Sequence, residues 1–261
     1  MSRELGAICL AAAEAGARVL RDLYDQPREI ALKGRIDLVT DADRASEETV
    51  LRLLEERAPG VKVLAEESGE RGAGETRFIV DPLDGTTNYA HGLPLFCCTV
   101  AVEVRSEVVA GCTVDPLRGE TYWAVRGAGT VLRRNGAERK LRVSQARDLG
   151  SALLCTGFPY DKREKLPQML RAFARFTELS QGTRRLGSAA LDLAYVAAGR
   201  LDGFYEQGLK AWDVAAGKIL VEEAGGLVTQ YDGSPLRLDA GELCAAAPAV
   251  HAALLAVLAG A

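Results

Sequence analysis

The feature that most restricts the fold of this chain is a succession of short apolar or alternating segments between Phe78 and about Val143. Turn-forming residues separate the segments. Asn135-Gly136 is a strong hairpin signal, because both residues tolerate the positive φ that a type I′ turn requires. The expected strands cover residues 96–104, 107–114, 121–125, 130–132 and 140–143. This pattern predicts a meandering antiparallel sheet.

Apolar residues at helical spacing precede this sheet. Residues 4–24 predict a first helix. A second helix is expected to begin near Thr40 or Asp41, either of which can cap it, and to end at Pro59-Gly60. The rest of this half is expected to form a strand at 61–65, a mobile loop at 33–36 and a loop at 71–75. Two helices are therefore expected to pack against the sheet.

Beyond residue 151, helical and strand patterns alternate. The expected strands cover 152–156, 203–206, 227–230 and 243–246, and the expected helices cover 163–179, 188–198, 213–224 and 248–258. The chain is thus expected to be α/β (α+β), with an antiparallel meander in an N-terminal half, residues 1–150, and a mixed sheet in a C-terminal half, residues 151–261. No flexible linker marks the boundary between the halves.

The composition argues against several classes of function. A net charge of −4 gives no reason to expect nucleic acid or a membrane surface as a partner. No run approaches the ~18 apolar residues of a transmembrane helix, and the N-terminus does not resemble a signal peptide. None of the six cysteines forms a Cys-x-x-Cys pair, which favours reduced core cysteines in a cytoplasmic protein. Two histidines leave little room for a histidine metal site or a Ser-His-Asp triad.

Two carboxylates, Asp81 and Asp84, lie where an expected strand ends and a Gly-Thr-Thr turn begins. Carboxylates are hard oxygen ligands for Mg²⁺, and the Leu83 carbonyl between them is available as a third ligand. The turn at Gly85-Thr86-Thr87 is expected to open a helix whose N–H groups face a phosphate, with Gly85 allowing close approach. Metal and phosphate would then meet in one loop, an arrangement suited to metal-assisted hydrolysis of a phosphate ester.

The alternative interpretation of this motif is an ordinary Asp-Pro turn at the surface. A second copy of its opening occurs at Asp115-Pro116-Leu117-Arg118, where an arginine stands in place of the second acid and no Gly-Thr-Thr follows. We expect this second copy to be a plain turn. The difference between the two copies is what favours a functional role for the first.

Other acids lie beside expected element ends, and each has a structural alternative. Glu66-Glu67 follows the strand at 61–65, although a glutamate pair is usually exposed. Asp213 follows Trp212 at an expected helix start, where it can act as a simple N-cap. Asp43 is ambiguous in the same way, with solvation at a helix start as its structural alternative. Acids gathered in one cleft repel one another unless cations intervene, so a cluster would imply bound metal. All-oxygen ligands favour Mg²⁺, Mn²⁺ or Ca²⁺ over Zn²⁺.

Such a cluster suggests a mechanism that needs no nucleophilic side chain. Two ions about 4 Å apart can activate a water and stabilise the leaving oxygen. Thr86 could orient the attacking water through its hydroxyl. Direct attack by water without a phospho-enzyme is therefore expected.

These motifs together resemble the inositol monophosphatase family of Mg²⁺-dependent, lithium-sensitive sugar phosphatases. The resemblance runs from about residue 33 to 226. The matching segments are Asp37-Leu38-Val39-Thr40 with Asp43, Glu66-Glu67-Ser68, Asp81-Pro82-Leu83-Asp84-Gly85-Thr86-Thr87-Asn88-Tyr89, Trp212-Asp213-Val214-Ala215-Ala216-Gly217, and Glu222-Glu223-Ala224-Gly225-Gly226. The resemblance implies a layered αβαβα fold, a homodimer, two or three Mg²⁺ ions that Mn²⁺ can replace, and inhibition by Li⁺ and Ca²⁺.

The resemblance also implies a role for each matching residue. The expected ligands of the metal that binds the attacking water are Glu66, Asp81, the Leu83 carbonyl and Thr86, with Glu66 shared by a weaker third ion. Those of the second metal are Asp81, Asp84 and Asp213. The residues expected to polarise the water are Asp43, Glu67 and Thr86. The expected substrate contacts are Lys33, Asp84, Gly85, Thr86, Gly187, Ser188, Ala189, Glu206 and Lys210, among which Glu206 hydrogen-bonds the inositol ring.

Two departures from the family pattern leave the substrate open. Lys210 stands where animal members carry a histidine, and Ser188 replaces a threonine. Inositol monophosphate is the expected substrate because Glu206 is retained, although Glu206 can also be an ordinary strand-end acid. The alternatives are the same chemistry on fructose 1,6-bisphosphate, NADP or histidinol phosphate, and a non-catalytic regulator that binds metal or a partner.

Overall fold

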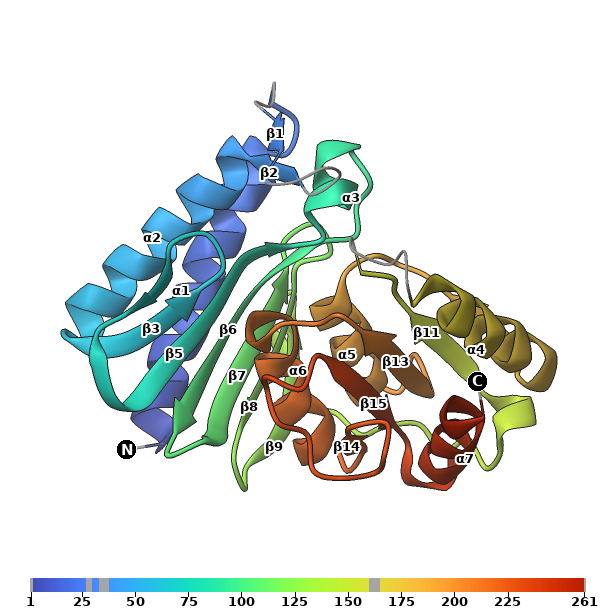
Figure 1. Cartoon of the computed structure of the whole chain (residues 1–261). Helices are drawn as coiled ribbons and strands as arrows, with labels where there is room; N and C mark the ends of the chain where they lie inside the picture. The colour runs from blue at the N-terminus through green and yellow to red at the C-terminus, as the bar shows by residue number, and fades with distance from the viewer. Residues whose placement is uncertain (1, 27–29, 33–37, 160–164, 261) are drawn as a thin grey trace.

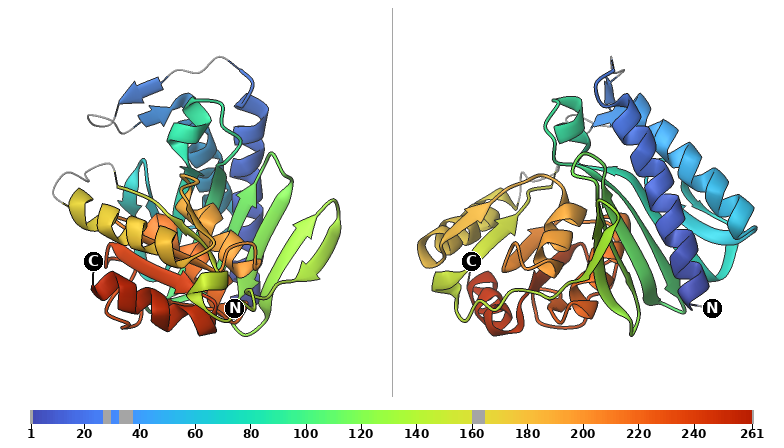
Figure 2. Two further views of the ribbon diagram at one scale, coloured as in Figure 1. Left: turned by 90° about the vertical axis from the view of Figure 1, so that its right-hand side faces the viewer. Right: turned by 180° about the vertical axis from the view of Figure 1, so that it is seen from behind.

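The computed structural model has five layers of secondary structure, in which helices and sheets alternate (Figures 1 and 2). It describes residues 2–26, 30–32, 38–159 and 165–260. An eight-stranded sheet has α1 and α2 on one face and α5 and α6 on the other, and a five-stranded sheet separates α5 and α6 from α4 and α7. The bounds of these helices are α1 Ser2–Leu23, α2 Asp41–Arg57, α4 Leu166–Leu179, α5 Ala189–Ala197, α6 Ala211–Glu223 and α7 Pro248–Ala259. The predicted layered αβαβα fold is confirmed.

The large sheet is a meander with one parallel pair. Its strand order is β10-β9-β8-β7-β6-β5-β3-β4, and only β3 and β5 pair in parallel. The strands are β3 Val61–Ala65, β4 Gly69–Arg71, β5 Ala73–Asp84, β6 Cys97–Val104, β7 Glu107–Asp115, β8 Glu120–Val125, β9 Gly129–Arg134 and β10 Ala137–Lys140. The prediction of a loop at 71–75 was wrong, because β4 ends and β5 begins there. The last strand also lies three residues earlier than expected, directly after the Asn135-Gly136 turn, whose residues both have positive φ.

Side-chain alternation along the strands explains why both faces of the large sheet are buried. In β5, Phe78 and Val80 pack into the cluster formed with α1 and α2, whereas Ile79 packs into the cluster formed with α5 and α6. In β6, Val100 and Ala101 alternate in the same way. Successive side chains of a strand point to opposite faces, so an uninterrupted apolar run fills two hydrophobic cores at once.

The five-stranded sheet is mixed, as predicted. Strands β12, β11 and β13 pair in parallel, whereas β13, β15 and β14 pair in antiparallel fashion. The bounds are β11 Leu153–Thr156, β12 Gly182–Arg184, β13 Gly203–Gln207, β14 Leu227–Thr229 and β15 Glu242–Ala246. The sequence pattern did not indicate β12, which has three residues and lies at the edge of the sheet. A domain boundary near residue 150 stays a prediction.

Short elements complete the described structure. A two-stranded sheet joins β1 (Ile30–Leu32) to β2 (Leu38–Thr40), and η1 is a 3₁₀ turn at Leu149–Ser151. The five-residue helix α3 (Thr86–Ala90) follows Gly85, as expected. Among the helices described, none is long and apolar enough to cross a membrane.

One glycine permits the close contact between the large sheet and α6. A Cβ atom at Gly111 of β7 would lie 2.8 Å from the Cα and 3.0 Å from the carbonyl oxygen of Ala216. Gly111→Ala is therefore expected to lower the free energy of unfolding by about 1–3 kcal/mol, because the backbone of α6 cannot move aside cheaply. Urea denaturation measures this change. The control is Gly150→Ala, since Gly150 is exposed and its nearest neighbour would be 3.6 Å away. Equal stability of the two variants would contradict the expected overpacking.

Candidate active site

A cleft of about 240 Å³ lies where the carboxyl ends of β5, β11 and β13 meet the starts of α3, α5 and α6. Residues from both sheets line it. Those among them that were predicted as site residues are Glu66, Asp81, Leu83, Asp84, Gly85, Thr86, Gly187, Ser188, Ala189, Glu206, Lys210 and Asp213. The structure therefore brings together segments that lie more than a hundred residues apart in the sequence.

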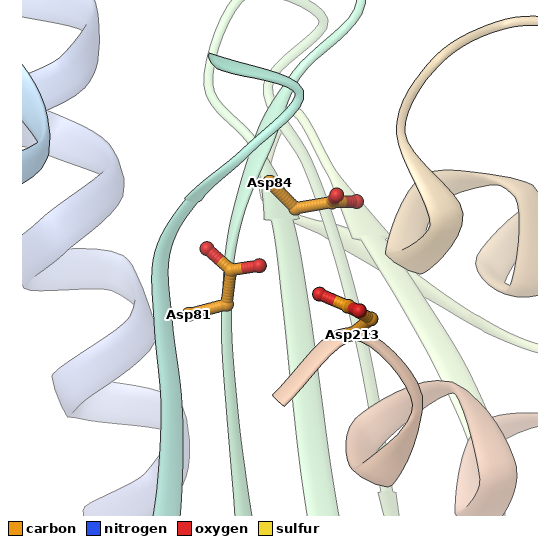
Figure 3. Close-up of side chains that lie close together, drawn as sticks. All are labelled: Asp81, Asp84 and Asp213. Atoms are coloured by element: carbon orange, nitrogen blue, oxygen red, sulfur yellow. The ribbon is translucent and has the colours of Figure 1, made fainter. Parts of the chain in front are cut away.

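Three carboxylates converge in this cleft. One carboxylate oxygen from each of Asp81, Asp84 and Asp213 lies within 4.8 Å of the other two (Figure 3). Asp81 and Asp84 come from the end of β5, and Asp213 comes from the first turn of α6. The pairing of β5 with β6 is irregular between the two β5 acids. This irregularity allows both side chains to face the same cleft.

The cluster is electrostatically unfavourable on its own. Burial raises the pKa of Asp81 well above its usual range, and the negative charges of Glu66, Asp84 and Asp213 raise it further. Burial also raises the pKa of Asp213 strongly, with the charge of Asp84 adding to the effect. Because like charges at this spacing oppose ionisation, the ionised cluster needs a counter-cation.

Asp84 also holds the start of α5. Its carboxylate accepts hydrogen bonds from the Ser188 hydroxyl at 2.6 Å and from the Ala190 N–H at 2.7 Å. These bonds oppose the effect of burial, which raises the pKa of Asp84. Ser188 is the N-cap residue of α5 but makes no capping hydrogen bond of its own. A carboxylate from the large sheet thus takes the place of a local cap.

The helix that carries Asp213 begins two residues earlier than expected, which rules out the alternative that Asp213 is a simple N-cap. The helix begins at Ala211, so Asp213 is its third residue and not its N-cap. Its Oδ2 atom accepts a hydrogen bond from the Lys210 N–H at 2.6 Å. The carboxylate is therefore held rigidly at the helix start while it also faces the cluster.

Asp43 and Thr86 form a hydrogen-bonded pair beside the cluster. The Thr86 hydroxyl lies 3.1 Å from Asp43 Oδ1 and 3.0 Å from the Leu83 carbonyl oxygen, and can donate to either. Asp43 is fully buried, and its Oδ2 accepts from the N–H and the hydroxyl of Thr40, the N-cap of α2. Solvation at a helix start, the structural alternative for Asp43, is wrong, because the side chain is buried and belongs to the capping box of α2.

The two adjacent glutamates point to different places. Glu66 lines the cleft, and its charge acts on Asp81. Glu67 instead lines a separate hollow beside α2, and its N–H donates to Glu47 at 2.9 Å. The structure does not bring the Glu67 side chain into the cleft lining, so its part in polarising water stays a prediction.

Further expected substrate residues line the same cleft. Glu206 is partly buried at the end of β13, and burial raises its pKa well above the usual range. Lys210 is exposed at the mouth of the cleft. The Ser188 hydroxyl donates a hydrogen bond to Asp84, so it helps to hold the carboxylate cluster in place. Lys33 lies outside the described residues.

No sequence pattern singled out Asp192, although it lies next to the site. This residue of α5 is 1% exposed, and its Oδ1 atom has no hydrogen-bond partner in the described part of the chain. Burial raises its pKa, and its negative charge in turn raises the pKa of Glu206. The available signal was a single acid within the apolar helix Ala189–Ala197.

The second Asp-Pro-Leu copy is the plain turn that was predicted. Asp115 accepts from the Leu117 N–H at 3.1 Å, as Asp81 accepts from the Leu83 N–H at 3.0 Å. Asp115 then pairs with the Arg118 guanidinium at 2.9 Å. Both copies share the hydrogen bond from the N–H two residues on, but residues 81–84 belong to β5, whereas residues 116–119 form a turn after β7.

Comparison with known proteins agrees with this geometry. The model of the inositol monophosphatase family matches residues 2–260. An inositol-1-monophosphatase of Synechocystis is 42% identical over 248 residues, which are 94% of this chain and 85% of the relative. A protein named Nus factor SuhB from Pasteurella multocida is 40% identical over 247 residues, covering 93% and 91%. The solved inositol monophosphatase of Anabaena superposes with a TM-score of 0.89 at 39% identity, covering 99% of this chain and 96% of that one.

The chain therefore belongs to the inositol monophosphatase family. It is a phosphoric monoester hydrolase of a metal-dependent family. Its clustered donors are all oxygen atoms, which suits Mg²⁺ or Mn²⁺ better than Zn²⁺. The residues present thus fit the metal that the family requires.

Proposed function

We propose that this protein hydrolyses a phosphate monoester of a small polyol in a Mg²⁺-dependent reaction, with inositol monophosphate as the first candidate substrate. The observation that carries the proposal is the convergence of three carboxylates, one buried and two partly buried, in a cleft that Glu206 also lines. The carboxylates suit the metal and phosphate end of a substrate. Glu206 suits a hydroxyl of the alcohol, since a carboxyl group can hydrogen-bond an alcohol O–H.

In this mechanism the metal is held by Asp81, Asp84 and Asp213, with Glu66 and the Leu83 carbonyl as further ligands. Bound Mg²⁺ supplies positive charge that neutralises the cluster and acidifies a coordinated water. The Leu83 carbonyl can contribute although it accepts from Thr86, because a carbonyl oxygen has two lone pairs. Mn²⁺ as a substitute and Li⁺ and Ca²⁺ as inhibitors follow from the family resemblance.

Thr86 and Asp43 are proposed to handle the proton of the attacking water. A threonine hydroxyl that accepts from the water can donate its own proton to Asp43 Oδ1, which lies 3.1 Å away. The bonds from Thr40 to Asp43 Oδ2 hold the acceptor in place. Because a metal-activated water is itself the nucleophile, no nucleophilic side chain is needed, and the proposal is direct attack by water without a phospho-enzyme.

The test is a phosphate-release panel with Mg²⁺ on inositol 1-phosphate, fructose 1,6-bisphosphate, NADP, 3′-phosphoadenosine 5′-phosphate and histidinol phosphate. The highest kcat/KM is expected for inositol 1-phosphate, because Glu206 can accept from a ring hydroxyl. A higher kcat/KM for another compound of the panel would support Mg²⁺-dependent ester hydrolysis but make that compound the substrate. Absence of Mg²⁺-dependent release from every compound would refute the proposal.

A second candidate is a regulatory role, alone or beside catalysis. It is favoured by relatives named Nus factor SuhB, such as the one from Pasteurella multocida. Against a purely non-catalytic role stands the full carboxylate set, since a decayed enzyme is expected to have lost at least one ligand. A homodimer and a cytoplasmic location stay predictions.

A further inference from the structure

Two neighbouring strand ends line the same cleft as the carboxylate cluster. Strands β11 and β13 run parallel, and Thr156 pairs with Tyr205 in the last step of their register. The next residues along the two strands are Gly157 and Glu206, and both line the cleft. The carboxyl ends of parallel strands are the usual place for ligand contacts in sheets of this kind.

The Glu206 carboxyl occupies the space that a side chain at position 157 would need. A Cβ atom built on Gly157 would lie 2.1 Å from Glu206 Oε2 and 2.3 Å from both Cδ and Oε1. The φ angle of Gly157 is outside the left-handed region, so an alanine there is not strained by the backbone. A glycine is therefore needed at position 157 because a side chain would collide with Glu206, and not because the backbone conformation excludes other residues.

The two strand ends cannot separate to make room. The Thr156 hydroxyl donates to the Tyr205 carbonyl oxygen at 2.6 Å, and Glu206 pairs with Leu243 of β15 on its other side. Further along, a Cβ atom on Gly208 would lie 2.4 Å from Cβ of Pro159, so the two loops are also in close contact. With the backbone held on both sides, the flexible end of Glu206 is the part that would move.

We infer that Gly157 is a specificity-determining positioning residue, whose missing side chain leaves the space in which the Glu206 carboxyl is held against the alcohol part of a polyol phosphate. The inference rests on the proposed function and extends it to a residue that has no side chain of its own. A side chain at position 157 would displace the carboxyl and weaken recognition of substrates through their hydroxyl groups. Esters whose alcohol lacks such hydroxyls would be affected less.

The test compares Gly157→Ala, Glu206→Ala and the double variant on two substrates. Inositol 1-phosphate carries ring hydroxyls, and p-nitrophenyl phosphate has none on its leaving group. Each single variant is expected to lower kcat/KM for inositol 1-phosphate by about 10- to 100-fold, the range for losing a hydrogen bond to a charged group, and to lower it less for p-nitrophenyl phosphate. The double variant is expected to match Glu206→Ala alone, because Gly157 acts through Glu206. Gly150→Ala, on an exposed turn, is the matched control and should keep wild-type rates.

A crystal structure of Gly157→Ala gives a second readout that does not depend on activity. It should show the Glu206 carboxyl displaced, with Asp81, Asp84 and Asp213 unmoved. An unmoved Glu206, additive losses in the double variant, or wild-type selectivity in Gly157→Ala would overturn the inference. Failure of the proposed function is recognised separately, since the wild-type chain would then release no phosphate from either ester, and the polyol role of Gly157 would be refuted with it.

Discussion

Replacing Asp213 with asparagine is expected to lower the Mg²⁺-dependent kcat/KM by about a thousandfold or more, because metal ligation and charge stabilisation are worth several kcal/mol. Asparagine can still accept the hydrogen bond from the Lys210 N–H, so the start of α6 should keep its structure. What the variant loses is a negative charge in the cluster. Steady-state phosphate release at saturating Mg²⁺, with circular dichroism to confirm folding, measures the effect.

The matched control is Asp115→Asn, which changes the same type of residue in the other Asp-Pro-Leu turn. That variant loses the ion pair with Arg118, so it should lose stability and not catalytic turnover. Wild-type turnover in a folded Asp213→Asn protein would show that the carboxylate cluster is not the metal site.

The second large effect concerns stability without metal. The pKa values of Asp81, Asp84 and Asp213 are raised in the folded chain, so the folded state retains protons that the unfolded state has released. The contribution of these three groups to the free energy of unfolding should therefore be greatest at acidic pH. It should fall as the pH rises above about 4 and through the raised folded-state values, with a slope of about 1.4 kcal/mol per pH unit for each retained proton.

Divalent cations should reverse this loss. Mg²⁺ at about 100 times its dissociation constant is expected to add about 2.7 kcal/mol, or roughly 5–10 °C in Tm for a chain of this size. Asp213→Asn removes one of the repelling charges, so the metal-free variant should melt higher than wild type at pH 8 and gain less from Mg²⁺. Thermal melts at several pH values, with EDTA or Mg²⁺, measure both effects. Identical Mg²⁺ shifts in the two proteins would contradict this account.

The sequence predicted the fold well where its signals were local and strong. The expected cap at Thr40 is present as a hydrogen-bonded N-cap of α2. The expected hairpin turn at Asn135-Gly136 is present, and both residues have positive φ. The prediction was wrong where tertiary pairing decides the structure. Residues 71–75 carry glycines typical of a loop, yet both ends are strand because β3 pairs with β4 on one side and β5 on the other.

The candidate site shows the same division. Motifs at strand ends and helix starts predicted which residues gather in the cleft, because those positions converge in sheets of this kind. They could not predict which way a side chain points: Glu67, expected to polarise the attacking water, lines a separate hollow, and its role stays a prediction. They also could not reveal the buried Asp192, or the contact between Gly157 and Glu206, since both depend on packing between segments far apart in sequence.

Asp84 has two roles, and they make turnover depend on how α5 packs on the large sheet. The carboxylate that belongs to the cluster also anchors the first turn of α5 through Ser188 and Ala190. A small slip of α5 along the large sheet would disturb the reactive centre long before the molecule melts. The catalytic rate should therefore respond to a shift of α5 on the large sheet more sensitively than the melting temperature does. Substitutions at this contact should be screened by their effect on rate first.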